Sequence, residues 1–198
     1  NGDCDVAIGG DGSWNIVYDT IASATFASSA DEGATWWVHP FTAEPVGGVD
    51  RPWILAHGGD VHLVWADVMS ALPFLAFSTK TSDGGRTWDT PALMGTFTPD
   101  EVNCFLGHPI VAPSGALQAP IACKDSGDVL GAGPVHILES ADGGATWEKR
   151  PTGVRSGGSI AASYAGDGGL WMTVNEQQAE GNRHGAVHST DEGRSFGA

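Results

Sequence analysis

The sequence predicts an all-β protein, a β-propeller built of four-stranded antiparallel blades. An eight-residue pattern, Ser/Thr-x-Asp-x-Gly-x-Thr/Ser-Trp/Phe, occurs four times, with its aspartates 52, 59 and 49 residues apart. Around each copy lie short runs rich in Val, Ile, Trp and Phe, bounded by Gly, Pro and Asp, and no segment shows a long helical period. Repeats of this length that each hold four strands are typical of propeller blades.

The strand-forming runs follow the same order in every repeat, so each repeat is expected to contribute four strands, except the last, which shows three. The expected strands are 5–10, 14–20, 23–29 and 35–41, then 52–58, 60–67, 73–80 and 87–93, then 108–113, 116–123, 134–140 and 146–150, and finally 159–166, 170–176 and 185–191. The blades are expected at roughly 1–46, 47–100, 101–153 and 154–198. The chain therefore predicts one propeller domain, or part of one, with an incomplete last blade.

The eight-residue pattern predicts a tight turn, repeated once per blade. Asp and Ser side chains accept or donate hydrogen bonds locally, and glycine supplies a backbone with positive φ. The closing aromatic residue is expected to pack into the core as a large apolar plug. One turn holds too few oxygen ligands for calcium, so we expect a structural role. The residues concerned are Asp31, Gly33, Trp36, Asp83, Gly85, Trp88, Asp142, Gly144, Trp147, Asp191, Gly193 and Phe196.

These four patterns resemble Asp-boxes, also called bacterial neuraminidase repeats, and the resemblance covers nearly the whole chain. In that family the box lies between the third and fourth strands of a blade. The stretch VDRPWILAHGGDVHLVWAD, followed by FSTKTSDGGRTW, is similar to secreted microbial sialidase-like propellers. The family includes sialidases, other glycoside hydrolases, sorting receptors and assembly factors, so the resemblance implies the fold more strongly than the function.

Composition and charge narrow the class of protein. The formal net charge is −15, with nine Lys and Arg residues, which disfavours a nucleic-acid partner because phosphate binding needs a basic face. No run approaches the ~20 apolar residues of a membrane span. No signal peptide is visible, and the start at Asn1 is what a processed or trimmed secreted product would show. We therefore expect an extracellular or cell-surface protein.

The cysteines predict one disulfide. Cys104 and Cys123 flank the first hairpin of the third repeat, whose turn is centred on Ser114, so an antiparallel pairing places them nearly opposite each other. A disulfide would imply an oxidising compartment. The alternative is a pair of buried free thiols. Cys4 is then free, or its partner lies outside this chain.

Acidic residues follow the second strand of every repeat, at the blade face opposite the repeated turns. In the resembling enzymes this face holds the active site. Two such carboxylates could cleave a glycosidic bond, and a ring of them could also hold a cation. The alternative is that they are solvated loop acids of an acidic protein. The residues are Asp19, Asp67, Asp125 and Glu176.

Basic and aromatic residues complete the candidate site. Sialidases use three arginines, a tyrosine–glutamate pair and an aspartate acid. In this sequence no convincing third arginine is found, and the N-terminal stretch NGDCDVAIGG lacks the arginine motif typical of sialidases. Arginine can grip a sugar carboxylate, and tryptophan can stack on a sugar ring, although core packing is the alternative for tryptophan. The histidines form no zinc motif, so neither a metal nor a cofactor is predicted. We assign Asp67, Asp19, Glu176 and Tyr18 to catalysis, and Arg51, Arg155, Asp50, His108, Asp125 and Trp65 to substrate binding.

Three function classes stay open at this point. The first is a glycan-active propeller that recognises or hydrolyses carbohydrate, and the second is a non-catalytic protein-binding scaffold at the cell surface. The third is a structural segment of a larger assembly. Propellers of the resembling family usually have six or more blades, so the chain is expected to be part of a longer protein, half of a homodimeric ring, or a closed four-blade ring.

Overall fold

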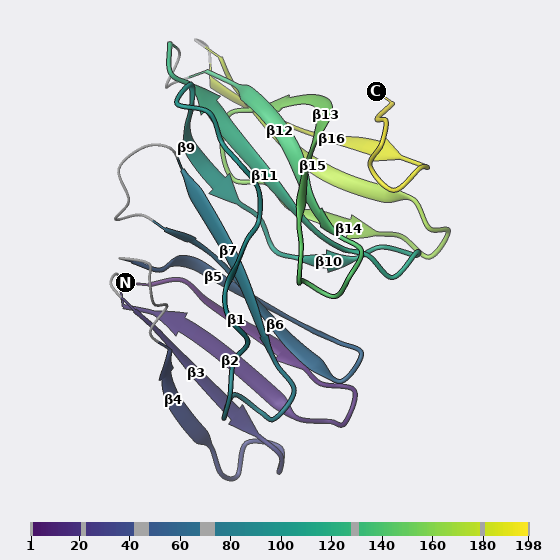
Figure 1. Ribbon diagram of the computed structural model, residues 1–198. Helices are drawn as coiled ribbons and strands as arrows, with labels where there is room; N and C mark the ends of the chain where they lie inside the picture. The colour runs from purple at the N-terminus through teal and green to yellow at the C-terminus, as the bar shows by residue number, and fades with distance from the viewer. Residues whose placement is uncertain are drawn as a thin grey trace. The chain divides into compact units, whose positions relative to one another are not determined.

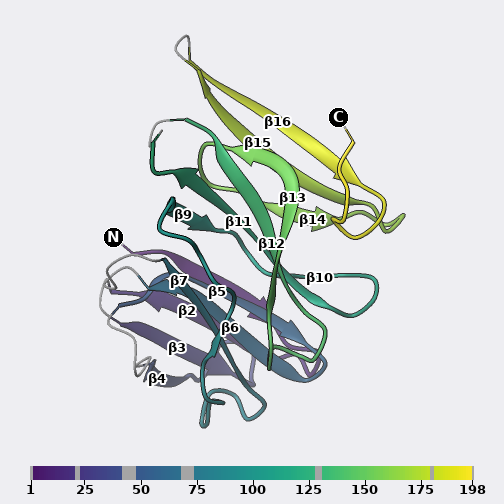
Figure 2. The ribbon, with the colours of Figure 1, turned by 45° about the horizontal axis from the view of Figure 1, so that its top comes forward.

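The structure is a computed structural model that describes residues 2–20, 23–41, 48–67, 74–127, 131–178 and 181–197. Within these ranges sixteen strands form four antiparallel sheets, which confirms the all-β prediction (Figures 1 and 2). The chain divides into two compact units. Unit 1 comprises Asn1–Ser70 and Leu75–Leu93, and unit 2 comprises Ala71–Phe74 and Met94–Ala198. None of the described residues belongs to a helix that is long and apolar enough to cross a membrane.

Unit 1 contains two sheets whose strands follow one another in chain order. The first has the order β1 (Cys4–Ile8), β2 (Trp14–Asp19), β3 (Ala24–Ser29) and β4 (Trp37–Phe41). The second has the order β5 (Asp50–His57), β6 (Asp60–Asp67), β7 (Leu75–Thr81) and β8 (Ala92–Leu93). In both sheets the third strand ends beside the start of the second, so each repeated turn lies at the strand end away from Asp19 and Asp67.

The core of unit 1 joins its two sheets. The fully buried Trp65 packs edge-on against Phe41, with ring centroids 5.3 Å apart, and Phe26 packs edge-on against Trp88 at 5.0 Å. Burial of each large aromatic side chain contributes on the order of 2 kcal/mol. A polar contact adds to this packing, because the Ile54 backbone N–H donates to the Asp5 carboxylate at 2.8 Å.

Unit 2 contains a five-stranded and a three-stranded sheet. The five strands are β9 (Glu101–Leu106), β10 (Ile110–Val111), β11 (Leu117–Asp125), β12 (Gly133–Ser140) and β13 (Glu148–Ser156). The other sheet has β14 (Ala162–Tyr164), β15 (Leu170–Gln178) and β16 (Gly181–Ser189), which are the three strands expected there. The strands β15 and β16 form the long antiparallel pair in Figure 2. A buried cluster of Ala122, Val135, Ile160 and Met172 links the two sheets.

The sequence did not predict β9. Both β9 and β10 pair with β11, so the first strand of this sheet is divided into two pieces. The predicted disulfide is confirmed: Cys104 on β9 is bonded to Cys123 on β11. The pairing register shifts between Ala122 and Lys124, and Asn103 has a φ of 47°, so the cysteines bridge an irregularity in the ladder. Cys4 is exposed and free.

The four repeated turns share one hydrogen-bond scheme. In the third copy, the Thr146 N–H and the Ser140 hydroxyl donate to Asp142 Oδ1 at 2.9 and 2.8 Å, and the Thr146 hydroxyl donates to Oδ2 at 2.6 Å. The Gly144 N–H donates to Ser140 Oγ at 2.8 Å. Donation by Thr146, through its hydroxyl and then its backbone, lowers the pKa of Asp142 to about 2.

The closing aromatic residues of these turns do not all pack equally well. Trp88 and Phe196 lie against the cores of units 1 and 2, as the pattern predicts. Trp36 is 37% exposed, so its expected role as a plug is wrong in the first turn. Its indole N–H donates to the Gly33 carbonyl at 3.0 Å, which keeps the local turn geometry without burying the ring.

A buried histidine on β6 predicts an acid-sensitive fold. Burial, with smaller contributions from Lys80 and His57, lowers the pKa of His62 to about 4. The unfolded chain therefore binds more protons than the folded one between about pH 4 and the unperturbed pKa of about 6.5, and stability falls as the pH falls through this window. In urea unfolding, wild type should lose on the order of 1–3 kcal/mol from pH 7 to pH 4, and His62→Gln should lose less. His184 is exposed, so His184→Gln is the control, and its stability should depend on pH as that of wild type does.

Candidate functional site

Four predicted site residues lie at the same end of the strands of unit 1, away from the repeated turns. Asp19 ends β2, Asp67 ends β6, and Asp50 and Arg51 begin β5. Asp50 lies opposite Ala66 in the β5–β6 ladder, which brings the start of β5 beside Asp67. Together with Asp3, these residues form what we call the acidic end of unit 1.

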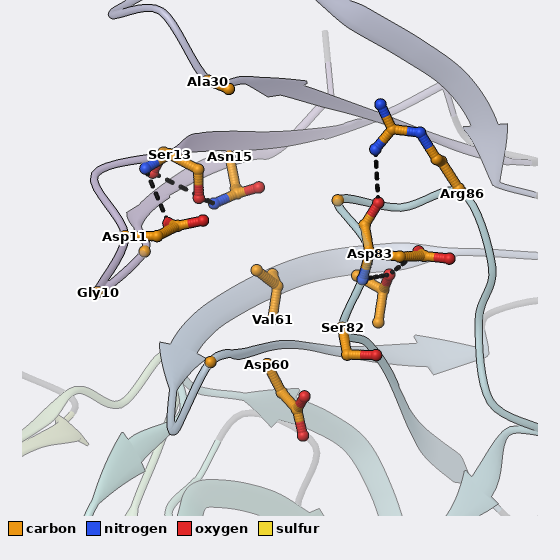
Figure 3. A pocket seen from close by; sticks show the side chains of 14 residues that line it. Gly10, Asp11, Ser13, Asn15, Ala30, Asp60, Val61, Ser82, Asp83 and Arg86 are labelled. Atoms are coloured by element: carbon orange, nitrogen blue, oxygen red, sulfur yellow. Dashed lines mark hydrogen bonds between the residues drawn. The ribbon is translucent and has the colours of Figure 1, made fainter.

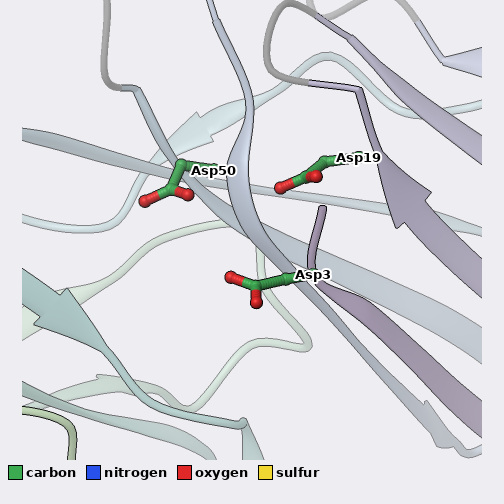
Figure 4. Close-up of side chains that lie close together, drawn as sticks. All are labelled: Asp3, Asp19 and Asp50. Carbon is green, nitrogen blue, oxygen red and sulfur yellow. The ribbon is translucent and has the colours of Figure 1, made fainter. Parts of the chain in front are cut away.

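Asp3 is the acidic residue that the sequence analysis missed. Asp3, Asp19 and Asp50 each place one carboxylate oxygen within 4.8 Å of the other two (Figure 4). The Asp19 N–H donates to the Asp3 carbonyl at 3.1 Å, because β1 and β2 pair up to Cys4 and Tyr18. The antiparallel register of this hairpin is the signal that could have placed Asp3 beside Asp19.

The close approach of these acids changes their titration. Asp19 is 9% exposed, and its Oδ1 has no hydrogen-bond donor among the described residues. Burial raises the pKa of Asp19, and the charges of Asp3 and Asp50 raise it further. Burial also raises the pKa of Asp50, with Asp3 adding to the effect and Arg51 opposing it. The acidic end therefore holds carboxyl groups that retain protons more readily than ordinary aspartates.

Arg51 occupies an unusual backbone position beside this cluster. Its φ is 52°, and the β5–β6 register shifts between Asp50 and Trp53. Such an irregularity redirects a side chain, and strained non-glycine residues are concentrated at functional sites. The Arg51 Nε lies 3.7 Å from Asp50 Oδ2, and its side chain is 25% exposed. A guanidinium thus lies beside Asp50, one of the three carboxylates.

The three carboxylates are also the donor set that could hold a metal. Their oxygens are close enough to share one ion, and hard cations such as Ca²⁺ prefer carboxylate oxygen. No other group of three His, Cys, Asp or Glu side chains with this spacing occurs in the described ranges. Among the described residues, the acidic end is therefore the place where a metal ion could bind.

Two residues assigned to the site lie elsewhere in unit 1. Trp65 is fully buried against Phe41 and Phe77, so it presents no surface on which a sugar could stack. Its assignment to substrate binding is corrected, and core packing is its role. Tyr18 is 42% exposed and precedes the buried Asp19 on β2. Adjacent strand residues point to opposite faces, so Tyr18 and Asp19 do not share a face.

The other predicted residues belong to unit 2. Arg155 lies near the end of β13, the last strand of its sheet and not the start of the next blade, because β13 continues to Ser156. Its guanidinium forms an exposed ion pair with Asp125 at 2.6 Å and also donates to the Ala132 carbonyl. Exposed pairs of this kind contribute roughly 0–1 kcal/mol. His108 is half-buried between β9 and β10. Glu176 lies in β15, and its side chain is outside the described part.

Comparison with known proteins supports the predicted architecture. No family model matches the sequence, and no curated protein matches it. Among solved structures, a protein of unknown function from Dyadobacter fermentans is similar over 100% of this chain and 67% of its own, with a TM-score of 0.76 and 17% identity. A Hadza microbial sialidase is similar over 98% of this chain and 45% of its own, with a TM-score of 0.73 and 19% identity.

A third similar structure has a different named activity. The Penicillium chrysogenum α-L-arabinanase, complexed with arabinobiose, is similar over 96% of this chain and 64% of its own, with a TM-score of 0.69 and 12% identity. The chain thus spans less than half of the sialidase and just under two thirds of the arabinanase. These likenesses support the predicted β-propeller fold, and at such identities they concern the fold alone.

Proposed function

We propose that the acidic end of unit 1 binds a neutral carbohydrate and that Asp50 transfers the proton in cleavage of its glycosidic bond. The observation that supports this is the meeting of Asp3, Asp19 and Asp50 within 4.8 Å, with raised pKa values for Asp19 and Asp50, beside Arg51. A carboxyl that keeps its proton next to one that ionises supplies the acid and the base that glycoside hydrolysis needs.

The burial of each group suggests its role. The Asp50 side chain is 41% exposed and can reach a ligand, whereas Asp19 is buried behind it. We assign proton donation to Asp50, and hydrogen bonding to sugar hydroxyls to Arg51. Three clustered carboxylates and one guanidinium lie at this end, so a sugar that carries its own carboxylate would be repelled. This charge balance favours a neutral sugar over sialic acid.

Further parts of the proposal concern the protein as a whole. We propose that the four repeated turns are Asp-boxes and that the protein is a secreted, sialidase-like propeller. The disulfide between Cys104 and Cys123 is compatible with an oxidising compartment. The fold likeness to a sialidase and an arabinanase supports carbohydrate as the ligand class.

Binding and turnover should separate in two variants. By calorimetry, wild type should bind arabinobiose more tightly than sialyllactose, and Arg51→Asn should weaken arabinobiose binding at least about tenfold. Asparagine is chosen because it tolerates the positive φ of this position. Asp50→Asn should keep the binding and lose hydrolysis of arabinan oligosaccharides. Arg194→Ala, in the exposed fourth turn, is the control. Equal affinities for arabinobiose in all variants would contradict the proposed binding site. Binding without turnover in wild type would contradict the hydrolytic role.

The pH dependence of turnover tests the role of Asp3. If Asp50 donates a proton, activity should fall as the pH rises through its raised pKa. Asp3 contributes to that increase, so Asp3→Asn should lower the pKa of Asp50 and move the alkaline limb of the rate profile to lower pH. A purely structural role of Asp3 would reduce the rate at every pH without moving the limb.

A further inference from the structure

A pocket of about 330 Å³ lies at the opposite end of unit 1, where the repeated turns are (Figure 3). It is enclosed by the β1–β2 turn, the β5–β6 turn and the second repeated turn, and Asn15 is among its lining residues. Pockets of this size are ordinary for small-molecule ligands. It is separate from the acidic end, since it lies at the other end of the strands.

Asn15, which lines this pocket, leaves one of its hydrogen-bonding atoms unused. The residue is fully buried. Its amide NH₂ donates to the carbonyls of Ala7 and Ser13 at 3.4 Å and to Ser13 Oγ at 3.2 Å. Because those two carbonyls can only accept, the NH₂ must face them, and Oδ1 faces the other way. Oδ1 is buried and finds no donor among the described residues, an arrangement that costs about 1–3 kcal/mol.

Unit 2 has a buried amide at the corresponding position whose hydrogen bonds are satisfied. Asn15 follows Trp14, which pairs with Ser29 of the first turn, and Gln118 follows Leu117, which pairs with Ser140 of the third. Gln118 is therefore the counterpart of Asn15, and it is also fully buried. Its amide donates to the Glu139 carboxylate at 2.6 Å and to the Glu192 carbonyl at 3.1 Å. Its Oε1 accepts the Tyr164 hydroxyl at 2.8 Å.

The partners that serve Gln118 are replaced by small residues in unit 1. Ala56 occupies in unit 1 the position that Tyr164 occupies in unit 2. Each of them pairs with a residue of the next strand, and that residue pairs in turn with the first residue of a repeated turn. Ala56 has no hydroxyl to donate. Glu192, whose carboxylate accepts from the Ser114 N–H and hydroxyl at 3.0 and 2.7 Å, corresponds to Gly84, which has no side chain. Of these two small residues, Gly84 lines the pocket, where the counterpart of the Glu192 side chain is missing.

We infer that the pocket is a second carbohydrate subsite, in which a hydroxyl of a neutral polyhydroxylated ligand donates to Asn15 Oδ1. The hydroxyl takes the place of the one that Tyr164 gives to Gln118. The lining holds the carboxylates of Asp11, Asp60 and Asp83 and one arginine, Arg86, which disfavours an anionic ligand. Asp60 is paired with Lys80 at 2.8 Å. Gly10 has open space around it, so a sugar ring can approach the backbone closely. This inference does not depend on the proposed function of the acidic end.

The test uses ¹⁵N-labelled full chain titrated with arabinobiose in ¹H–¹⁵N spectra. Wild type should show saturable shifts of the Asn15 side-chain amide and of the Gly10 and Gly84 backbone amides. Gly10→Phe fills the pocket at a position without positive φ and should weaken these shifts at least about tenfold. Gly166→Phe is the matched control, because the β14–β15 turn repeats the hydrogen bonds of the β1–β2 turn and Gly166 is equally open.

Two results would overturn the inference. One is the absence of saturable shifts at these amides in wild type, which would leave water as the partner of Asn15. The other is an unchanged affinity in Gly10→Phe. Gly84→Gln is a second blocking variant, to be used if Gly10→Phe is poorly folded, and it should weaken the shifts to the same extent. Glutamine suits this position because Glu32 and Glu192 adopt a positive φ at the equivalent position of their turns. Shifts at Asp50 and Arg51 report the acidic end separately, so each site can fail alone.

Discussion

Replacing Gly85 by alanine is expected to lower the free energy of unfolding by about 3 kcal/mol or more. Gly85 has a φ of 83°, which disfavours any residue with a β-carbon. A β-carbon there would also lie 2.4 Å from two ring atoms of Phe26, which is fully buried in the core of unit 1. The ring would have to move, and it packs against Trp88, so the strain would spread through the core.

Gly12→Ala separates the two causes. Gly12 has a φ of 84°, nearly the same as Gly85, but an added β-carbon would meet nothing within 4 Å. Denaturant unfolding of this variant should show only the backbone cost of about 1–2 kcal/mol. If both alanine variants lost the same free energy, contact with Phe26 would contribute nothing and this account of the turn would be wrong.

Removing the disulfide is the second substitution with a large expected effect. The bond between Cys104 and Cys123 closes a loop with a sequence separation of 19, which should stabilise the folded chain by about 3 kcal/mol. The Cys104→Ser/Cys123→Ser variant should therefore unfold at a lower denaturant concentration than wild type. A reducing agent should bring wild type to the same midpoint and leave the double variant unchanged.

Cys4→Ser provides the control for this series. Cys4 is exposed and free, so its replacement should change neither the midpoint nor the response to reducing agent. An equally large loss in Cys4→Ser would show that thiol chemistry other than the Cys104–Cys123 bond determines the stability.

The strands were predictable because their information is local. The repeated turns fix where each third strand ends, and the short apolar runs between glycine and proline mark the others. β9 was missed because Asn103 interrupts the run with a positive φ and the strand is held by pairing with β11, which lies later in the chain. The disulfide was predicted because a hairpin register can be read from its turn.

The candidate sites were only partly predictable because they depend on contacts between sheets. The acids that end β2 and β6 follow from the repeat, but the nearness of Asp3 depends on the β1–β2 register. Trp65 and Trp36 carry the same side chain, yet one is buried between two sheets and the other is exposed. The unused oxygen of Asn15 becomes visible only when its surroundings are compared with those of Gln118.

A crystal structure of Asp50→Asn with arabinobiose tests the central claim most directly, since this variant should bind the sugar without cleaving it. We expect sugar hydroxyls within hydrogen-bonding distance of residue 50 and of the Arg51 guanidinium. An acidic end that holds only water at saturating arabinobiose would contradict the account, whether or not the sugar occupies the pocket beside Asn15.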